Sequence, residues 1–418
     1  MDQVKTGTSA SRPATSSLEL LVKARELTAF FNAQGDANEA KGALTDETVT
    51  ALREFGFLGM WIPREFGGIE AWPTEAVEIV EALSYADGST GWVFMAAQVG
   101  MATAAAYLPG ATATRLFGQA MPIIAGQGAA IGRADVVPGG YRLSGKWRYG
   151  SGLLHAEYIH TGAQVFANGV LRCQAGSSNP ETRIFIVPVG QATLLHNWDV
   201  LGLRATGSID YEIEDVFVPD EWTHLHLETV PQHGGDLFRI GLMGMSAIGH
   251  CGFALGIGRR VLDELVALAH AKPGRSAMIA ENGGGEGFQE RFGAADAALR
   301  AARAFVFEAQ ADIERTAKAG RDLTTRQVTL ARLALNHLTA VAADVCDFAY
   351  KYGGGAALRA GTLQRCFRDM HAGTQHASTG PAMLRECAKE LLGFADGKVW
   401  TLRNLVEPPI LSRPGVAR

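Results

Sequence analysis

One stretch, Tyr141–Gly152, constrains this chain more than any other. From Tyr141 to Tyr149 apolar and polar residues alternate, which is the period of a half-buried strand. The stretch ends in Gly150-Ser151-Gly152, so the hydroxyl of Ser151 has no bulky neighbours in the sequence. Glycines at such a point often mark the close approach of another backbone or a flat ligand, although an ordinary tight turn gives the same pattern.

Composition narrows the class of protein. The chain has 418 residues, 47% hydrophobic and 19% charged, with a net charge of -5. This length supports two or three domains, the low charge fraction suggests buried subunit interfaces, and the acidic balance argues against nucleic acid or an anionic membrane as partner. Five cysteines without a C-x-x-C pair predict reduced thiols in a cytoplasmic protein. The apolar run from Thr90 to Leu108 is rich in Ala and Gly and predicts a buried helix, not a membrane span.

Periodicity divides the chain into helical, β and helical parts. We predict a disordered N-terminus over residues 1–17, an α domain over 18–120, an antiparallel β domain over 121–230, a four-helix bundle over 231–393 and an irregular tail over 394–418. The predicted strands are Tyr141–Tyr149, Tyr158–Val165, Arg183–Val187 and Ser208–Val218. The predicted long helices are Leu237–His270, Phe288–Ala319, Thr325–Tyr352 and Thr362–Leu392.

A second motif follows the first and carries a resemblance to a known family. It consists of Trp198, Leu201-Gly202, Arg204, Thr206-Gly207-Ser208, Asp210 and Val216-Phe217-Val218-Pro219. Together with Tyr141–Gly152 it resembles the middle domain of the acyl-CoA dehydrogenase-like flavoproteins. The resemblance implies an α+β fold with an N-terminal helical domain, a central antiparallel β-barrel-like domain and a C-terminal four-helix bundle, usually assembled as a homotetramer.

The resemblance also implies which residues hold a flavin, either FMN or FAD. Tyr149 would flank the flavin ring, and Ser151 would reach its reactive N5 atom. A basic pair, Lys272 and Arg275, would meet the flavin phosphates, where a cation is physically reasonable but a solvated helix end is the alternative. The other expected cofactor-binding residues are Trp147, Gly152, Thr206, Gly353 and Gly354.

Two departures from the dehydrogenase pattern point to a different branch. The segment Ile124–Asp135 lacks the family's T-E-P-x-x-G-S-D loop, and no acid follows Arg368-Asp369 where many dehydrogenases carry their catalytic base. His376 stands beside that position, on a predicted helix face of small residues, although a histidine buried by packing is the competing interpretation.

This departure resembles the two-component (group D) flavin-dependent monooxygenases. The resemblance implies hydroxylation of a small aromatic or heterocyclic substrate by reduced flavin and O2 through a C4a-hydroperoxyflavin, with His376 and Ser151 as catalytic residues. Trp92, Gln98 and His376 are the predicted substrate pocket. No G-x-G-x-x-G occurs in the chain, so a separate flavin reductase is the expected partner.

Other interpretations stay open at this stage. An acyl-CoA-type dehydrogenase or oxidase with a relocated base could use Glu290, Glu308 or Glu386, and a non-catalytic flavoprotein scaffold is a third interpretation. A metal site is not predicted, because the candidate cluster has no fixed ligand spacing. That cluster is His224, His226, Glu228, His233 and Asp236. The remaining histidines, namely His155, His160, His196, His250, His270 and His337, are predicted to be structural.

Overall fold

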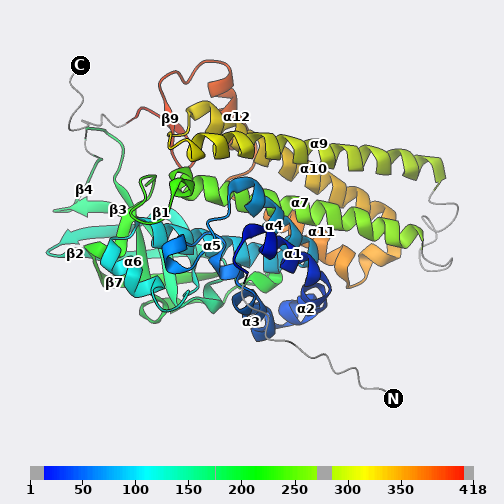
Figure 1. The fold of residues 1–418 in the computed structure, drawn as a ribbon, viewed down its shortest axis with the longest axis horizontal. Coiled ribbons are helices and arrows are strands. Elements are labelled where there is room, and N and C mark those ends of the chain that lie inside the picture. Colours follow the sequence, from blue (N-terminus) through cyan, green and yellow to red (C-terminus); the bar gives the residue numbers. More distant parts are fainter. Residues whose placement is uncertain (1–13, 175, 271–284, 409–418) are drawn as a thin grey trace.

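The helical, β and helical parts occur in the predicted order. A computed structural model describes residues 14–174, 176–270 and 285–408. The sheet occupies one end of the molecule, the N-terminal helices cover one side, and the long C-terminal helices run across the other (Figure 1). The predicted fold class is confirmed. The disorder predicted for residues 1–17 falls mostly outside the described residues, and the described chain begins at Ala14.

Three of the N-terminal helices begin after residues whose side chains accept hydrogen bonds from free backbone N–H groups. Ser16, Thr45 and Asp87 each cap a helix in this way. Residues 17–41 form two helices and not one, because the chain leaves the helical conformation at Leu27. The helices are α1 (Ser17–Glu26), α2 (Thr28–Lys41), α3 (Asp46–Glu54), α4 (Pro73–Ala86), α5 (Gly88–Tyr107) and α6 (Gly110–Phe117).

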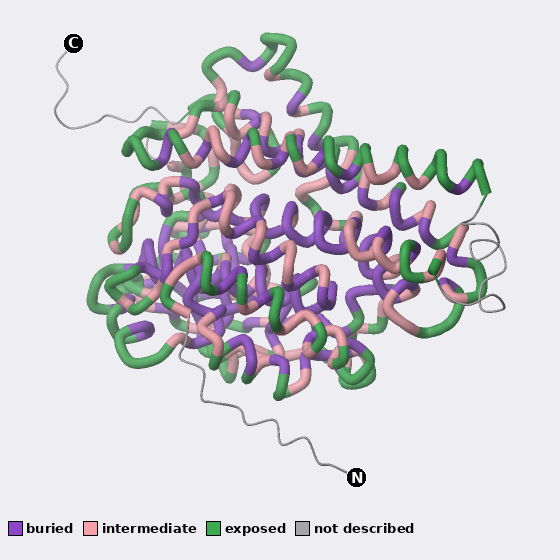
Figure 2. Tube along the Cα trace, turned by 45° about the vertical axis from the view of Figure 1, so that its right-hand side comes forward, coloured by how far each residue is buried: buried purple, intermediate pink, exposed green. Residues whose placement is uncertain are grey.

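Helix α5 is buried along nearly its whole length, so the prediction of a buried helix over residues 90–108 is confirmed. A helix that is apolar on all sides needs protein on all sides, and α5 packs against α4, α7 and β1. Buried residues concentrate in the middle of the molecule, where these elements meet (Figure 2). Because α5 is packed on all sides, its side chains are held in fixed positions.

The central sheet has the strand order β6-β7-β2-β1-β3-β5-β8, with β4 paired to β3. Most pairs are antiparallel as predicted, but β1 and β3 run parallel. The segment Ile124–Asp135, which was not predicted as a strand, lies in β1, because its run of Ala and Gly hides the alternation of a strand. The strands are β1 (Ile124–Val137), β2 (Gly140–Gly150), β3 (Tyr158–Ala167), β4 (Val170–Leu171), β5 (Thr182–Pro188), β6 (Thr193–Leu194), β7 (Ile209–Pro219) and β8 (Thr223–Leu225).

The C-terminal part differs from the prediction in its last helix. The predicted helix Thr362–Leu392 is two helices, because the chain turns between Gly373 and Pro381 and Pro381 starts a new helix. The helices are α7 (Gly241–Ala269), α9 (Gly285–Lys318), α10 (Thr325–Leu358), α11 (Thr362–Gly373) and α12 (Pro381–Leu391). In the tail, β9 (Val399–Trp400) pairs with β10 (Leu405–Val406), where no regular structure was predicted.

The long helix α7 is the centre of the C-terminal part. Among the described residues, one helical segment, Asp236–Ala269, has the length and mean hydropathy (1.5) of a membrane span, and 83% of that apolar window is buried inside the protein. Its apolar surface packs against α4, α5 and α10. The apolar composition of α7 is thus explained by packing within this chain.

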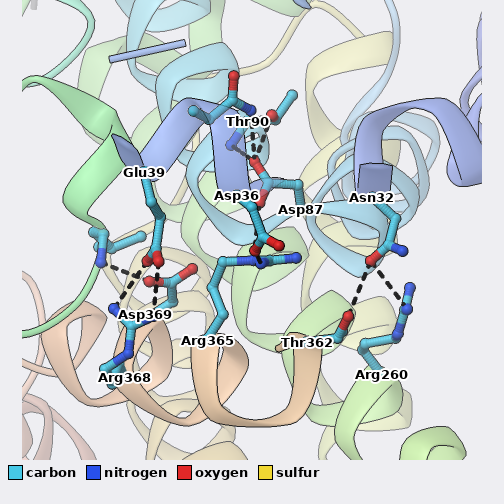
Figure 3. Close-up of polar contacts among 12 residues, drawn as sticks. Asn32, Asp36, Glu39, Asp87, Thr90, Arg260, Thr362, Arg365, Arg368 and Asp369 are labelled. Carbon is cyan, nitrogen blue, oxygen red and sulfur yellow. Dashed lines mark hydrogen bonds and ion pairs between the residues drawn. The ribbon is translucent and has the colours of Figure 1, made fainter. Parts of the chain in front are cut away.

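Ion pairs, one of them involving the buried Arg365, attach α11 to the N-terminal helices. Arg365 extends from α11 toward Asp36 on α2 and Asp87 at the start of α5, at 2.7 and 3.6 Å (Figure 3). Arg368 binds Glu39 at 2.8 Å in the same close-up. Buried charges are tolerated when they are paired in this way, and removal of one partner is costly. The orientation of α11 is therefore determined by contacts with α2 and α5.

Asp369, also on α11, holds the loop that precedes β7. Its Oδ1 atom accepts a hydrogen bond from the Leu203 N–H at 2.6 Å, whereas the buried Oδ2 atom has no hydrogen-bond partner among the described residues. Gly202 allows this approach, because a Cβ there would lie 1.9 Å from the carbonyl oxygen of Arg368. Burial, and then the charge of Asp87, raise the pKa of Asp369 to about 7.

We predict that Asp369→Asn removes a pH-dependent part of the free energy of unfolding. The pKa of Asp369 is about 7 in the folded protein and ordinary in the unfolded chain. The folded state therefore binds the extra proton between these values, and its stability falls as pH rises through this window. The asparagine that replaces Asp369 cannot ionise. The free energy of unfolding of this variant should therefore rise relative to wild type by about 1–3 kcal/mol between pH 5 and pH 8.

Denaturant unfolding of both proteins at several pH values measures this difference. Asp46→Asn is the control, because pairing with Lys41 lowers the pKa of that exposed carboxyl, which stays ionised over the same range. A difference in unfolding free energy between wild type and Asp369→Asn that does not change with pH would contradict the assignment.

Candidate functional site

The backbone has an unusual conformation at the end of β2 and just after it. Tyr149 has a φ of 68°, which a bulky residue rarely adopts, and Gly152 has a φ of 78°. As a result the Tyr149 side chain is 59% exposed, whereas Ser151 beside it is 9% exposed. An exposed aromatic ring next to a sheltered hydroxyl is the arrangement that a flat ligand would cover.

Ser151 belongs to a chain of hydrogen-bonded hydroxyls. The Trp92 indole N–H donates to Ser151 Oγ at 3.0 Å, and Ser151 and Ser208 lie 2.7 Å apart. Ser208 lies 2.6 Å from Thr206, whose hydroxyl donates to the Leu203 carbonyl at 2.8 Å. Because Thr206 uses its proton on that carbonyl, Ser208 donates to Thr206 and Ser151 donates to Ser208. One lone pair of Ser151 is then left to accept a further hydrogen bond.

Two histidines stack beside Trp92. The ring centroids of His250, on α7, and His376 lie 4.0 Å apart with an interplanar angle of 31°. Trp92 meets both rings edge-on, at 5.1 Å from His250 and 5.9 Å from His376. Trp92 also packs against Phe253 at 4.9 Å, and the absence of a side chain at Gly373 leaves room for that contact. Helices α5 and α7 and the end of α11 therefore converge on the Trp92 ring.

His376 does not lie on a helix, contrary to the prediction. It lies in the turn between α11 and α12, and its N–H donates to the Gly373 carbonyl. Its Nδ1 atom accepts from the Ser378 N–H at 3.3 Å, so the neutral ring carries its proton on Nε2. The side chain keeps partial contact with solvent, but the packed surroundings, and then His250, hold its pKa well below the usual value.

His250 was predicted to be structural, yet the structure brings it to His376. Its Nδ1 atom lies 2.7 Å from the Ser246 carbonyl, which can only accept, so the proton of the neutral ring is on Nδ1. Its Nε2 atom is buried and has no hydrogen-bond partner among the described residues. Burial lowers the pKa of His250 to about 4. No local pattern in the sequence links His250 to His376, since His250 lies on α7 and His376 in the turn after α11, and these segments meet only in the folded chain.

The other predicted site residues lie in several environments. Trp147 is enclosed in the sheet, stacked on Tyr211 at 5.4 Å, with no face open to a cofactor. Gln98 is fully buried and binds backbone groups of Trp61 and Leu58. Gly353 and Gly354 lie near the end of α10, where Gly354 interrupts the helix with a φ of 49°. Lys272 and Arg275 lie outside the described residues.

The acids considered as relocated bases lie apart from the Ser151–His376 group. Glu290 and Glu308 are exposed on α9. Glu386, on α12, pairs with Lys389 and accepts from the Leu405 N–H at 3.2 Å. None of the three acids proposed as a relocated base is therefore placed at the site, as the dehydrogenase interpretation would require.

The histidines between the sheet and the C-terminal helices have separate partners. His233 pairs with Glu65 at 2.9 Å, and Asp236 pairs with Arg239 at 2.8 Å. His224 lies 2.8 Å from the Leu225 carbonyl through Nδ1. Within the described ranges, no group of three or more His, Cys, Asp or Glu side chains could hold a metal ion.

The Ser151 region fits the flavin expected from the resemblance. A reduced flavin carries an N–H at N5, and the remaining lone pair of Ser151 can accept from it. The exposed ring of Tyr149 lies beside that hydroxyl as a surface for the flavin ring. Two hollows of about 470 and 180 Å³ are lined by other residues and include neither Ser151 nor the histidine pair. The candidate flavin site is therefore defined by its hydrogen-bonding groups and not by a cavity.

Comparison with known families and proteins agrees with this chemistry. Residues 24–115 match the acyl-CoA dehydrogenase N-terminal domain, and residues 248–381 match the acyl-CoA dehydrogenase C-terminal domain. The chain is 30% identical over 359 residues to an indole-3-acetate monooxygenase of Pseudomonas putida, a match that covers 84% of this chain and 87% of that protein. It is 27% identical over 348 residues to the flavin-dependent monooxygenase oxygenase subunit HsaA of Rhodococcus jostii, covering 81% and 88% of the two chains.

A solved structure has the same fold. The HsaA monooxygenase from M. tuberculosis superposes with a TM-score of 0.82 at 24% identity, over 90% of this chain and 98% of that one. The family matches span both helical domains, and the relatives align along most of their length. The chain therefore belongs to the acyl-CoA dehydrogenase-like superfamily and, within it, to the flavin-dependent monooxygenases.

Proposed function

We propose that this protein is the oxygenase component of a two-component system that hydroxylates a small aromatic or heterocyclic substrate. The observation that carries the proposal is the Trp92 ring, which hydrogen-bonds to Ser151 on one side and contacts the histidine pair on the other. A flavin over Tyr149 and a substrate beside the histidines would then lie next to one another. Indole-3-acetate, the substrate named for the relative from Pseudomonas putida, is the first compound to test.

Each residue of the site has a defined task in this proposal. Reduced flavin supplies the electrons with which one oxygen atom of O2 is transferred to the substrate and the other leaves as water. Ser151 accepts the hydrogen bond from the flavin N–H, and Trp92 and Ser208 hold the serine in place. His376, with its proton on Nε2, donates to an oxygen that gains negative charge during the transfer. FMN and FAD both fit this assignment.

We propose a separate reductase as the partner, a proposal that the sequence and the names of the relatives support. The chain contains no G-x-G-x-x-G fingerprint, and the Rhodococcus jostii relative is named an oxygenase subunit. All five cysteines are free, and four of them are buried, which suits a reducing compartment, so we propose a cytoplasmic location.

We predict that the protein can use only flavin that has already been reduced by another source. The purified protein should hydroxylate indole-3-acetate when mixed with chemically reduced FMN or FAD and O2, with product identified by mass spectrometry. With NADH and oxidised flavin it should consume no NADH above the rate of flavin alone. Rapid NADH oxidation without a reductase would contradict the two-component proposal. Anaerobic reduction of bound flavin by an acyl-CoA thioester would support the dehydrogenase alternative.

The second prediction separates the tasks of Ser151 and His376. Ser151→Ala should release hydrogen peroxide in place of product, because loss of a buried hydrogen bond destabilises the flavin arrangement by about 1–3 kcal/mol. His376→Ala should leave the rate of flavin oxidation unchanged while product formation falls by about 10²–10³, as for loss of a donor to developing charge.

Oxygen uptake, peroxide release and product yield in the same reaction distinguish the two variants. His196→Asn is the control, since His196 is exposed and its φ of 48° suits asparagine. Full coupling of O2 to product in His376→Ala would assign that histidine to packing alone.

The third prediction concerns assembly. Apolar side chains remain exposed on α12 and just beyond it, including Leu392 at 67% and Phe394 at 74% exposure. We propose that the C-terminal helices of several copies cover this surface at the centre of a homotetramer. Light scattering at micromolar concentration should give four times the chain mass, and a monomer mass would refute the proposal.

A further inference from the structure

The two stacked histidines present opposite hydrogen-bonding groups. His376 receives the Ser378 N–H on Nδ1 and therefore carries its proton on Nε2. His250 donates from Nδ1 to the Ser246 carbonyl and therefore has a free lone pair on Nε2. The contacts of each ring with its own backbone thus make one histidine a donor and its neighbour an acceptor.

The acceptor atom of His250 requires an explanation. Buried polar atoms in folded proteins nearly always have a hydrogen-bond partner, and a buried atom without one marks a strained, catalytic or ligand-binding position. Among the described residues His250 Nε2 is such an atom, and the ring that carries it contacts Trp92 and His376. These are the residues beside which the substrate lies in the proposed function. A ligand that donates a hydrogen bond would complete the site.

We propose that His250 Nε2 accepts a hydrogen bond from the ring N–H or O–H of the aromatic substrate, so that His250 selects substrates that carry such a donor. This assignment rests on the proposed function and adds a specificity-determining residue to it. Trp92 and Phe253 supply apolar surface for the rest of the aromatic ring. His376 then serves the oxygen atom, and the two histidines do not compete for the same proton.

The hydrogen bond leaves the proton on the substrate. Burial holds the pKa of His250 at about 4, far below that of an indole N–H or a phenol. The imidazole therefore accepts the hydrogen bond without removing the proton from the substrate. The shared hydrogen bond still raises the electron density of the aromatic ring, which helps its attack on an electrophilic oxygen.

Binding of two related probes tests the assignment without measuring catalysis. Indole-3-acetate has a ring N–H, and 1-methylindole-3-acetate has a methyl group in its place. Titration calorimetry on the full-length wild-type protein with flavin bound should show about 10–100-fold tighter binding of the N–H compound. The ratio of the two dissociation constants is the quantity to compare among variants.

Two substitutions of His250 separate hydrogen bonding from stacking. His250→Phe keeps a flat ring against His376 and removes the acceptor, so the ratio should fall to about one. His250→Gln offers an amide oxygen as acceptor and should restore part of the ratio. His376→Phe is the matched control and should keep the wild-type ratio, since that ring is a donor.

Three results would overturn the inference. The first is a wild-type protein that binds the N–H compound no better than the methylated one. The second is His250→Phe with an unchanged ratio, which would assign the discrimination to shape. The third is loss of the ratio in His250→Phe and His250→Gln alike while thermal unfolding shows both variants folded, which would make His250 a support for its neighbours. Absence of hydroxylated product with an intact wild-type ratio would contradict the proposed function and leave the role of His250 in binding standing.

Discussion

The hydrogen bond from the Leu203 N–H to the buried carboxyl of Asp369 joins the parts of the structure on which the site depends. Asp369 is on α11, which Arg365 and Arg368 attach to the N-terminal helices. Leu203 belongs to the loop before β7, and its carbonyl ends the chain of hydroxyls that starts at Ser151. A displacement of α11 would therefore reach the serine through backbone and hydroxyl contacts, and would also move the turn that carries His376.

Helix α5 provides the second fixed point. Trp92 is held by packing from α7 and from the end of α11, and its indole N–H points to Ser151. Trp92 thus determines the distance between the serine and the histidine pair. A rigid aromatic side chain suits this purpose, because it has few rotatable bonds and loses little conformational entropy when buried. The same ring contacts both the serine assigned to flavin and the histidines assigned to substrate.

The histidine pair gives the proposed site a chemistry different from that of a dehydrogenase. A dehydrogenase requires an ionised carboxylate near its substrate to remove a proton. Here both imidazoles are kept neutral by burial, and each has its tautomer set by a backbone group. A neutral donor and a neutral acceptor can orient an aromatic ring and an oxygen atom without adding a charge to the site. This arrangement is suited to oxygen transfer, and poorly suited to proton abstraction from carbon.

The sequence by itself determined the order of the domains, the strand that leads to Ser151 and the departure from the dehydrogenase pattern at His376. These features depend on local signals, namely the alternation of a strand, the helical period, capping residues and one long motif. The tertiary structure decided the parallel pairing of β1 with β3 and the meeting of His250 with His376. It also decided that Trp147 is a core residue and that Trp92 binds Ser151. The physical reason is that strand pairing, burial and contacts between side chains depend on partners that are distant in the sequence, so no local pattern encodes them.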